Sequence, residues 1–183
     1  MRFLVSFLVL IGILFADEYS DFNQYYQEQN YASYKKACQI GKRIFSNNEK
    51  DEKLLAIIGM ACLKADYIDT LGMIQSRLLY TKEARASASI FSSLVLQKRL
   101  LQQFLHDDAN ISSFALPVIE HPLSKAFIKA RDGAFKLESQ SPKRITFEDE
   151  GIHYSVYIDA SKKGKMAIDM RFSDGTIQQH RYR

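Results

Sequence analysis

The spacing of the hydrophobic residues changes partway along the chain, and this change limits the folds that the sequence can adopt. Between residues 22 and 105 apolar residues recur at intervals of three and four, as on the buried face of an α-helix. From Ala134 onward they alternate with polar residues, as in a strand with one buried face. The sequence therefore predicts an α+β fold: antiparallel helical hairpins, a short helix at Leu123–Arg131, and a four- to five-stranded antiparallel β-meander.

Polar residues mark where the predicted helices begin. Asp51, Asp69 and Thr81 each precede an apolar helical stripe, and their side chains can accept hydrogen bonds from the free N–H groups of a first turn. Two further helices are expected before them, one around Phe22 and one from about Tyr34. The last and longest helix is expected to end near residues 107–110.

The turns of the predicted sheet can be placed by requiring that apolar residues share one face. This rule favours a two-residue turn, a three-residue loop that ends in glycine, and a second two-residue turn. It also points the side chains of His153 and His180 outward. The expected pairs are Phe147 with Tyr154 across Glu150-Gly151, Ile158 with Ile168 across residues 162–164, and Phe172 with Ile177 across Asp174-Gly175.

Two segments of the helical half resemble each other. QNYASYKKA and KADYIDTLG each place a polar residue and a tyrosine at a turn between helices. Residues 21–105 resemble the tetratricopeptide repeat, a two-helix unit that has a tyrosine near its inner turn. The chain departs from that pattern at Thr70, where the family prefers alanine. The resemblance implies a protein-binding role, and a plain antiparallel helical bundle is the alternative.

The N-terminal segment MRFLVSFLVLIGILFA has the features of a secretory signal peptide. A basic residue precedes an apolar run of roughly thirteen residues, whereas a helix that spans a bilayer needs about twenty. We expect cleavage after Ala16 and a periplasmic location, with membrane contact only through the signal peptide or peripherally. An uncleaved N-terminal membrane anchor is the alternative.

These observations predict four segments in the chain. Prolines 117 and 122 interrupt the pattern between the helical half and the sheet, which indicates a linker. The predicted segments are a signal peptide at residues 1–16, a helical repeat-like domain at 17–109, a linker at 110–122, and a short helix with the antiparallel sheet at 123–183.

Cys38 and Cys62 are the two cysteines of the chain. Both lie on apolar stripes of consecutive predicted helices, and antiparallel helices pack closely enough for a disulfide at facing small positions. An exported protein experiences an oxidising compartment, where such a pair is expected to be bonded. Two buried free thiols are the alternative.

No catalytic, metal-binding or cofactor-binding motif is present in the sequence. The four histidines are not spaced for zinc, and the glycines form no phosphate-binding loop. We therefore expect a non-catalytic protein without a cofactor. The formal net charge of +4 permits anionic partners, but export argues against nucleic acid.

Two surfaces are candidates for binding. Tyrosine supplies amphipathic area that is favoured at protein interfaces. The first candidate surface therefore consists of Tyr25, Tyr26, Tyr31 and Tyr67. The second is a basic patch at one end of the predicted sheet, made of Lys143, Arg144, Lys162, Lys163, Lys165, Arg181 and Arg183.

The expected function is a protein-binding or scaffold subunit. We expect it to be accessory to a larger bacterial envelope assembly, such as a secretion or motility apparatus, with another envelope protein as partner. The alternative is a module for polar ligands or wall polymer, because the open face of the predicted sheet carries polar residues that include Ser155, Tyr157 and Asp169. A small hydrolase is the less favoured third interpretation.

Overall fold

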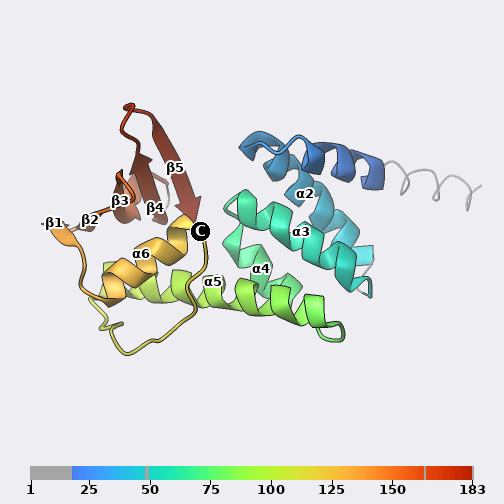
Figure 1. The fold of residues 1–183 in the computed structure, drawn as a ribbon, viewed down its shortest axis with the longest axis horizontal. Helices are drawn as coiled ribbons and strands as arrows, with labels where there is room; N and C mark the ends of the chain where they lie inside the picture. Colours follow the sequence, from blue (N-terminus) through green and yellow to red (C-terminus); the bar gives the residue numbers. More distant parts are fainter. Residues whose placement is uncertain (1–17, 48–49, 163, 183) are drawn as a thin grey trace, which may run out of the picture. The chain divides into compact units, whose positions relative to one another are not determined.

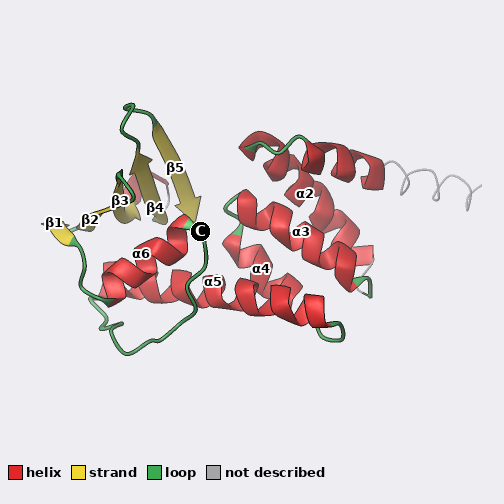
Figure 2. Cartoon of the chain, viewed as in Figure 1, coloured by secondary structure: helices red, strands yellow, loops and turns green. Residues whose placement is uncertain are grey.

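The chain folds as helices followed by a five-stranded antiparallel sheet, which confirms the predicted α+β class (Figures 1 and 2). The structure is a computed structural model and describes residues 18–47, 50–162 and 164–182. The predicted signal peptide lies outside these residues. The elements are a helix at 18–27, α2 (Tyr31–Asn47), α3 (Glu52–Lys64), α4 (Ile68–Gln75), α5 (Lys82–Asp107), α6 (Pro122–Arg131), β1 (Lys136–Gln140), β2 (Lys143–Asp149), β3 (Ile152–Asp159), the 3₁₀-helix η1 (Ala160–Lys162), β4 (Lys165–Arg171) and β5 (Ile177–Tyr182).

The chain divides into two compact units, and the division falls inside α5. The described residues up to 88 form the helical unit, and those from 89 onward form the sheet unit. This boundary differs from the predicted one at residues 110–122. The second half of α5 belongs with the sheet because Gln97 Nε2 donates to Pro117 O (2.8 Å), and Lys143 Nζ donates to Phe104 O (3.0 Å).

Helix starts in the helical unit follow the capping prediction at two of three positions. The Asp51 side chain accepts from Leu54 N (3.0 Å), and Thr81 Oγ1 accepts from Ala84 N (3.1 Å). Asp69 does not cap α4, because that helix already begins at Ile68 with Tyr67 at the N-cap position. The Asp69 carboxylate instead lies in the first turn, where the helix dipole favours negative charge.

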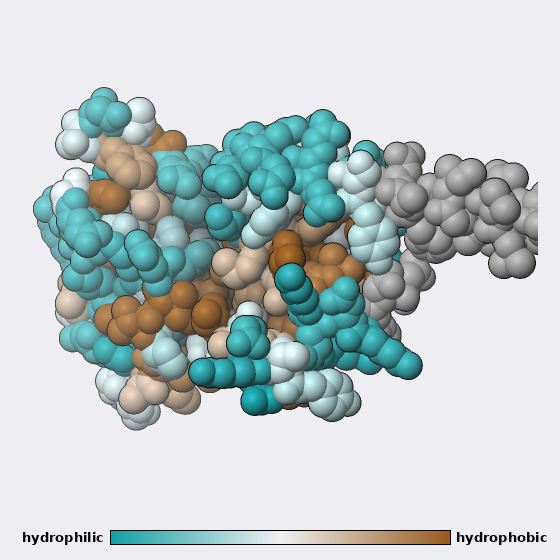
Figure 3. All heavy atoms as spheres, turned by 45° about the vertical axis from the view of Figure 1, so that its right-hand side comes forward, coloured by the Kyte–Doolittle hydropathy of each residue, from teal (hydrophilic) through white to brown (hydrophobic). Residues whose placement is uncertain are grey.

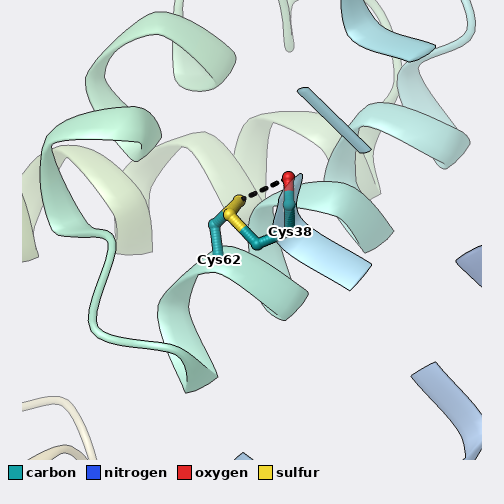
Figure 4. The surroundings of a disulfide bond; sticks show 2 residues. All are labelled: Cys38 and Cys62. Atoms are coloured by element: carbon teal, nitrogen blue, oxygen red, sulfur yellow. Dashed lines mark hydrogen bonds between the residues drawn. A yellow bond between two sulfur atoms is a disulfide. The ribbon is translucent and has the colours of Figure 1, made fainter. Parts of the chain in front are cut away.

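A disulfide joins Cys38 on α2 to Cys62 on α3, as the sequence predicted (Figure 4). Both residues are fully buried, and their Cα atoms lie 4.7 Å apart. The dashed line in Figure 4 joins Cys62 Sγ to Cys38 O at 4.0 Å; a disulfide sulfur carries no proton, so this is a packing contact. One turn further along α2, Gly41 packs so closely on Ile58 that a Cβ atom would lie 2.7 Å from Ile58 Cγ2.

The first hairpin of the sheet has the predicted register. Ile145 pairs with Val156 and Phe147 with Tyr154, so their apolar side chains share the inner face. Glu150 and Gly151 have φ angles of 53° and 76°, as a two-residue type I′ turn requires. The prediction of this turn is confirmed.

The β3–β4 loop is two residues longer than predicted. Ile158 pairs with Met166, and Val156 pairs with Ile168. The Asp159 side chain causes the difference, because it accepts from Ser161 N (3.0 Å) and Ser161 Oγ (2.6 Å) and so starts η1. A shift of two residues keeps each side chain on its face.

The β4–β5 turn differs from the prediction by one residue, which exchanges the two faces of β5. Arg171 pairs with Ile177, whereas the predicted partner of Ile177 was Phe172. The turn is a three-residue loop that ends at Gly175 with φ of 84°, closed by a bond from Phe172 N to Thr176 O (3.0 Å). His180 is consequently buried, so its predicted outward orientation is wrong.

Helix α6 packs against the sheet and is tied to the β2–β3 turn. The side chain of Phe127 is fully buried, and α6 contacts β4. Lys125 Nζ lies 2.8 Å from Asp149 Oδ2 and 2.6 Å from Glu150 Oε2, and these carboxylates raise the pKa of the ammonium group. The expected packing of the short helix on the sheet is confirmed.

Candidate functional site

Two of the four predicted contact tyrosines meet at one place in the helical unit. Tyr31 begins α2 and Tyr67 precedes α4, and both lie near Asp66, whose φ of 63° marks the turn between α3 and α4. Partial burial and the Asp66 carboxylate raise the pKa of the Tyr31 phenol. Half of the Tyr31 side chain nevertheless remains exposed, so this ring is available to a partner.

The other predicted tyrosines are engaged inside the helical unit. Tyr26 stacks on Phe22 and meets Tyr34 edge to face, with ring centroids 5.9 Å and 5.8 Å apart. Lys36 Nζ lies 4.8 Å from the ring centroid of Tyr25. In the same way Lys42 Nζ covers the Tyr67 ring at 4.9 Å. These are packing and cation–π contacts that leave the three rings at most partly accessible.

A second surface of the helical unit was not predicted. It is the 79–81 loop, which comprises Leu79, Tyr80 and Thr81 between α4 and α5. Leu79 is 53% exposed and Tyr80 is 82% exposed, whereas the preceding Leu78 is buried. Figure 3 colours one face of the molecule by residue hydropathy and shows hydrophobic areas beside hydrophilic ones. The signal in the sequence is the segment LLYT, in which large apolar residues stand directly before a helix cap.

The backbone of the 79–81 loop is held by the buried carboxylate of Glu52. This group accepts hydrogen bonds from the N–H of Leu79, from the N–H of Tyr80 (2.6 Å) and from the N–H of Thr81 (2.9 Å). The bond from Tyr80 contributes most to lowering the pKa of Glu52 from 4.5 to about 2, because these donors stabilise the charged form. Glu52 lies at the start of α3, so the loop is fixed to a distant part of the sequence.

Arg85 holds the same loop through its carbonyl groups. Its Nη1 donates to Tyr80 O (2.6 Å) and to Leu79 O (3.3 Å). The loop is therefore bonded on its donor side by an anion and on its acceptor side by a cation. The side chains of Leu79 and Tyr80 make none of these bonds and are displayed on a fixed backbone.

Replacing Glu52 by glutamine is expected to loosen the 79–81 loop. An amide cannot accept all three N–H bonds with the strength of a carboxylate, so hydrogen exchange at Leu79, Tyr80 and Thr81 should accelerate on the order of tenfold. In the parent protein the folded pKa of Glu52 lies below its unfolded value. Its contribution is therefore complete above about pH 4.5 and lost as the pH falls toward 2.

Hydrogen exchange followed by NMR from pH 6 to pH 2, corrected for intrinsic rates, measures this effect. The Glu83→Gln variant is the control. Glu83 is exposed, and this substitution removes the same charge from a position next to the loop. Equal protection of the loop in the Glu52→Gln variant and the parent would contradict the proposed role of the carboxylate.

The predicted basic patch of the sheet unit is largely engaged in internal contacts. Lys143 is one-tenth exposed, pairs with Asp108 and covers the Phe104 ring at 4.2 Å. Lys165 lies opposite Asp159 in the β3–β4 ladder. The side chain of Lys162, and Lys163 and Arg183 altogether, lie outside what the structure describes.

Two members of this patch meet on the open face of the sheet. The guanidinium carbon of Arg144 lies 3.9 Å from the ring centroid of Tyr157, and that of Arg181 lies 5.8 Å from it. Arg181 Nη1 also donates to Asp169 Oδ1 (2.6 Å), and the Tyr157 hydroxyl donates to Asp169 Oδ2 (2.8 Å). The result is an ordered polar network rather than a free cationic surface.

His121 and His180 lie near each other, whereas His106 and His153 stand on other elements. His106 lies in the last turn of α5, and His153 is exposed on β3. His121 accepts a bond from Leu123 N (3.2 Å), and burial together with nearby His180 lowers its pKa to about 4. Within residues 18–47, 50–162 and 164–182, no group of three or more His, Cys, Asp or Glu side chains is placed to hold a metal ion.

The chain was compared with protein-family models, with curated proteins and with solved structures. None of them matches. The helices that the structure describes include none with the length and apolar character needed to cross a bilayer.

Proposed function

We propose that this protein is a non-catalytic, exported protein-binding subunit whose helical unit docks another envelope protein through the 79–81 loop. The observation that carries the proposal is the exposure of Leu79 and Tyr80 on a backbone that Glu52 and Arg85 hold from both sides. Adjacent exposed apolar side chains on an ordered backbone support an interaction site more than an isolated exposed residue does.

The fixed backbone favours binding for an entropic reason. Association normally costs free energy because loops and side chains become ordered at the interface. The N–H and carbonyl groups of the 79–81 loop are already hydrogen-bonded in the free protein, so binding adds little to the entropic cost of ordering this loop. Tyrosine is also enriched among the residues that dominate interface energies. We therefore infer that Tyr80 inserts into an apolar pocket of the partner, with Leu79 beside it.

The location is part of the same proposal. The disulfide between Cys38 and Cys62 is compatible with an oxidising compartment, and residues 1–16 have the pattern of an export signal. We propose the periplasm of a bacterium as that compartment, and an envelope assembly as the source of the partner. The resemblance of residues 21–105 to the tetratricopeptide repeat supports a protein partner and stays a prediction.

Affinity purification of variants from the envelope fraction tests this proposal. Replacing both Leu79 and Tyr80 by alanine is expected to weaken the complex by about 2 kcal/mol or more, which is roughly a thirtyfold loss. The parent protein should recover a stoichiometric companion that the double variant does not. Because both side chains are exposed, the far-UV circular dichroism of the variant should be unchanged.

Val118→Ala is the matched control, because Val118 is an exposed apolar residue (77%) of the sheet unit. This variant should retain the companion. Recovery of the same companion by the Leu79→Ala/Tyr80→Ala variant, or recovery of no stoichiometric companion by the parent, would overturn the proposal.

A further inference from the structure

The open face of the sheet contains a hollow that the proposed function does not use. We call it the sheet groove. It has a volume of about 260 Å³, and residues of all five strands line it. The polar residues used below are Glu138, Arg144, His153, Ser155, Asp169 and Arg171.

The antiparallel register places these side chains next to one another. Ser155 lies opposite Asp169, and His153 lies opposite Arg171. Arg171 in turn lies opposite Ile177 of β5, and Asp169 lies opposite Gln179. The groove thus has a charged centre on β3 and β4, with a polar and an apolar side chain along its β5 border.

The internal bonds leave an excess of positive charge in the sheet groove. The carboxylate of Asp169 is already neutralised, because Arg181 and the Tyr157 hydroxyl both donate to it. Glu138 lies 3.8 Å from Arg144, beyond hydrogen-bond distance. Among the described residues Arg171 has no ion-pair or hydrogen-bond partner. The two positive charges of Arg144 and Arg171 therefore face the single negative charge of Glu138. The net charge of the sheet groove is +1.

Arg144 is positioned before any ligand arrives. Its guanidinium group stacks on the Tyr157 ring at 3.9 Å, and Nη1 lies 3.4 Å from Ser155 Oγ. A stacked guanidinium loses little freedom when it binds, and its planar N–H groups match a carboxylate in geometry. Arg144 and Arg171 thus supply a fixed donor and an unengaged donor within one hollow.

We propose that the sheet groove binds a small monocarboxylate that carries hydroxyl groups, which is the chemistry of a hydroxy acid or a sugar acid. The single excess positive charge suits a monoanion, whereas a phosphate dianion would carry one negative charge more than the groove offsets and would be repelled by Glu138. Ser155, Gln179 and Glu138 can bond to hydroxyl groups. The volume corresponds to roughly nine waters at about 30 Å³ each, which is enough for one such molecule.

This inference is independent of the proposed function, because every residue in it belongs to the sheet unit.

NMR titration of the full-length protein tests the inference with four probes: sodium D-glucuronate, D-glucose, sodium acetate and glucose 6-phosphate. Glucuronate is expected to shift the amide signals of Ser155, Asp169 and Arg171 in a saturable manner. Glucose lacks the carboxylate, acetate lacks the hydroxyl groups, and the phosphate carries a second charge. Each of these three should bind at least roughly tenfold more weakly than glucuronate.

Arg171→Gln is expected to weaken glucuronate binding at least roughly tenfold, because it removes the unengaged donor. Arg131→Gln removes the same charge from α6, where that side chain pairs with Asp132, and should leave binding unchanged. The inference is overturned if glucuronate causes no saturable shift, if any other probe binds as tightly, or if the two arginine variants weaken binding equally.

Discussion

Removal of the disulfide is expected to lower the free energy of unfolding of the helical unit by about 3 kcal/mol. The bond closes a loop of 24 residues between Cys38 and Cys62, so it restricts the unfolded chain far more than the folded one. The Cys38→Ala/Cys62→Ala variant tests the prediction. Hydrogen exchange at the amides of α2 and α3 reports the stability of this unit directly.

Reduction of the parent protein is the matched control for that variant. A thiol reductant should lower the protection of α2 and α3 by a similar amount in the parent, and should have no effect on the variant. If oxidised and reduced parent protein exchange at the same rates, the disulfide does not stabilise the unit.

Phe127→Ala is expected to destabilise the sheet unit by about 3–5 kcal/mol. The ring is fully buried where α6 packs on the sheet, so its removal loses apolar burial and leaves a cavity. Urea denaturation followed by circular dichroism, together with hydrogen exchange at the amides of β3 and β4, measures the loss.

The exposed apolar side chain of Ile177, in the same unit, provides the comparison. It is 53% exposed, and its replacement by alanine should change the stability by less than about 0.5 kcal/mol. Similar losses for Phe127→Ala and Ile177→Ala would contradict the assignment of the inner and outer faces of the sheet.

The sheet was predictable where the sequence left one solution. A two-residue turn at Glu150-Gly151 puts the apolar residues of both strands on one face, Gly151 suits the positive φ angle that such a turn requires, and the φ angles of both residues agree. The β3–β4 loop could have three or five residues, because both lengths leave the apolar side chains of β3 and β4 on the same face of the sheet. The bond from Ser161 to Asp159 selects the longer one, and the alternation of residues carries no information about it.

The last strand was mispredicted because its own pattern is ambiguous. In IQQHRYR, Ile177 and Tyr182 are five positions apart, so one of them must face outward. The prediction placed Ile177 inside because it paired Ile177 with Phe172 across a two-residue turn at Asp174-Gly175. The three-residue turn at Gly175 instead buries Tyr182, and His180 comes inside with it.

The candidate sites were predictable only in part, because they depend on contacts between residues that are far apart in the sequence. Tyr31 and Tyr67 were named as candidate contacts from the sequence, but their proximity was not predicted; only the folded chain places both near Asp66. The 79–81 loop was missed because its ordering depends on Glu52, which is 27 residues from Leu79. A glutamate at the start of a helix looks ordinary in the sequence, and only the folded chain brings it to the loop.

The contacts that order the 79–81 loop have a consequence for how the protein can evolve. Glu52 and Arg85 contact Leu79 and Tyr80 through the main-chain atoms of these two residues, so these bonds do not depend on which side chains the two positions carry. Substitutions at positions 79 and 80 can change which partner the protein binds without changing its fold. Divergent descendants should therefore vary freely at 79 and 80 and keep an acid at 52.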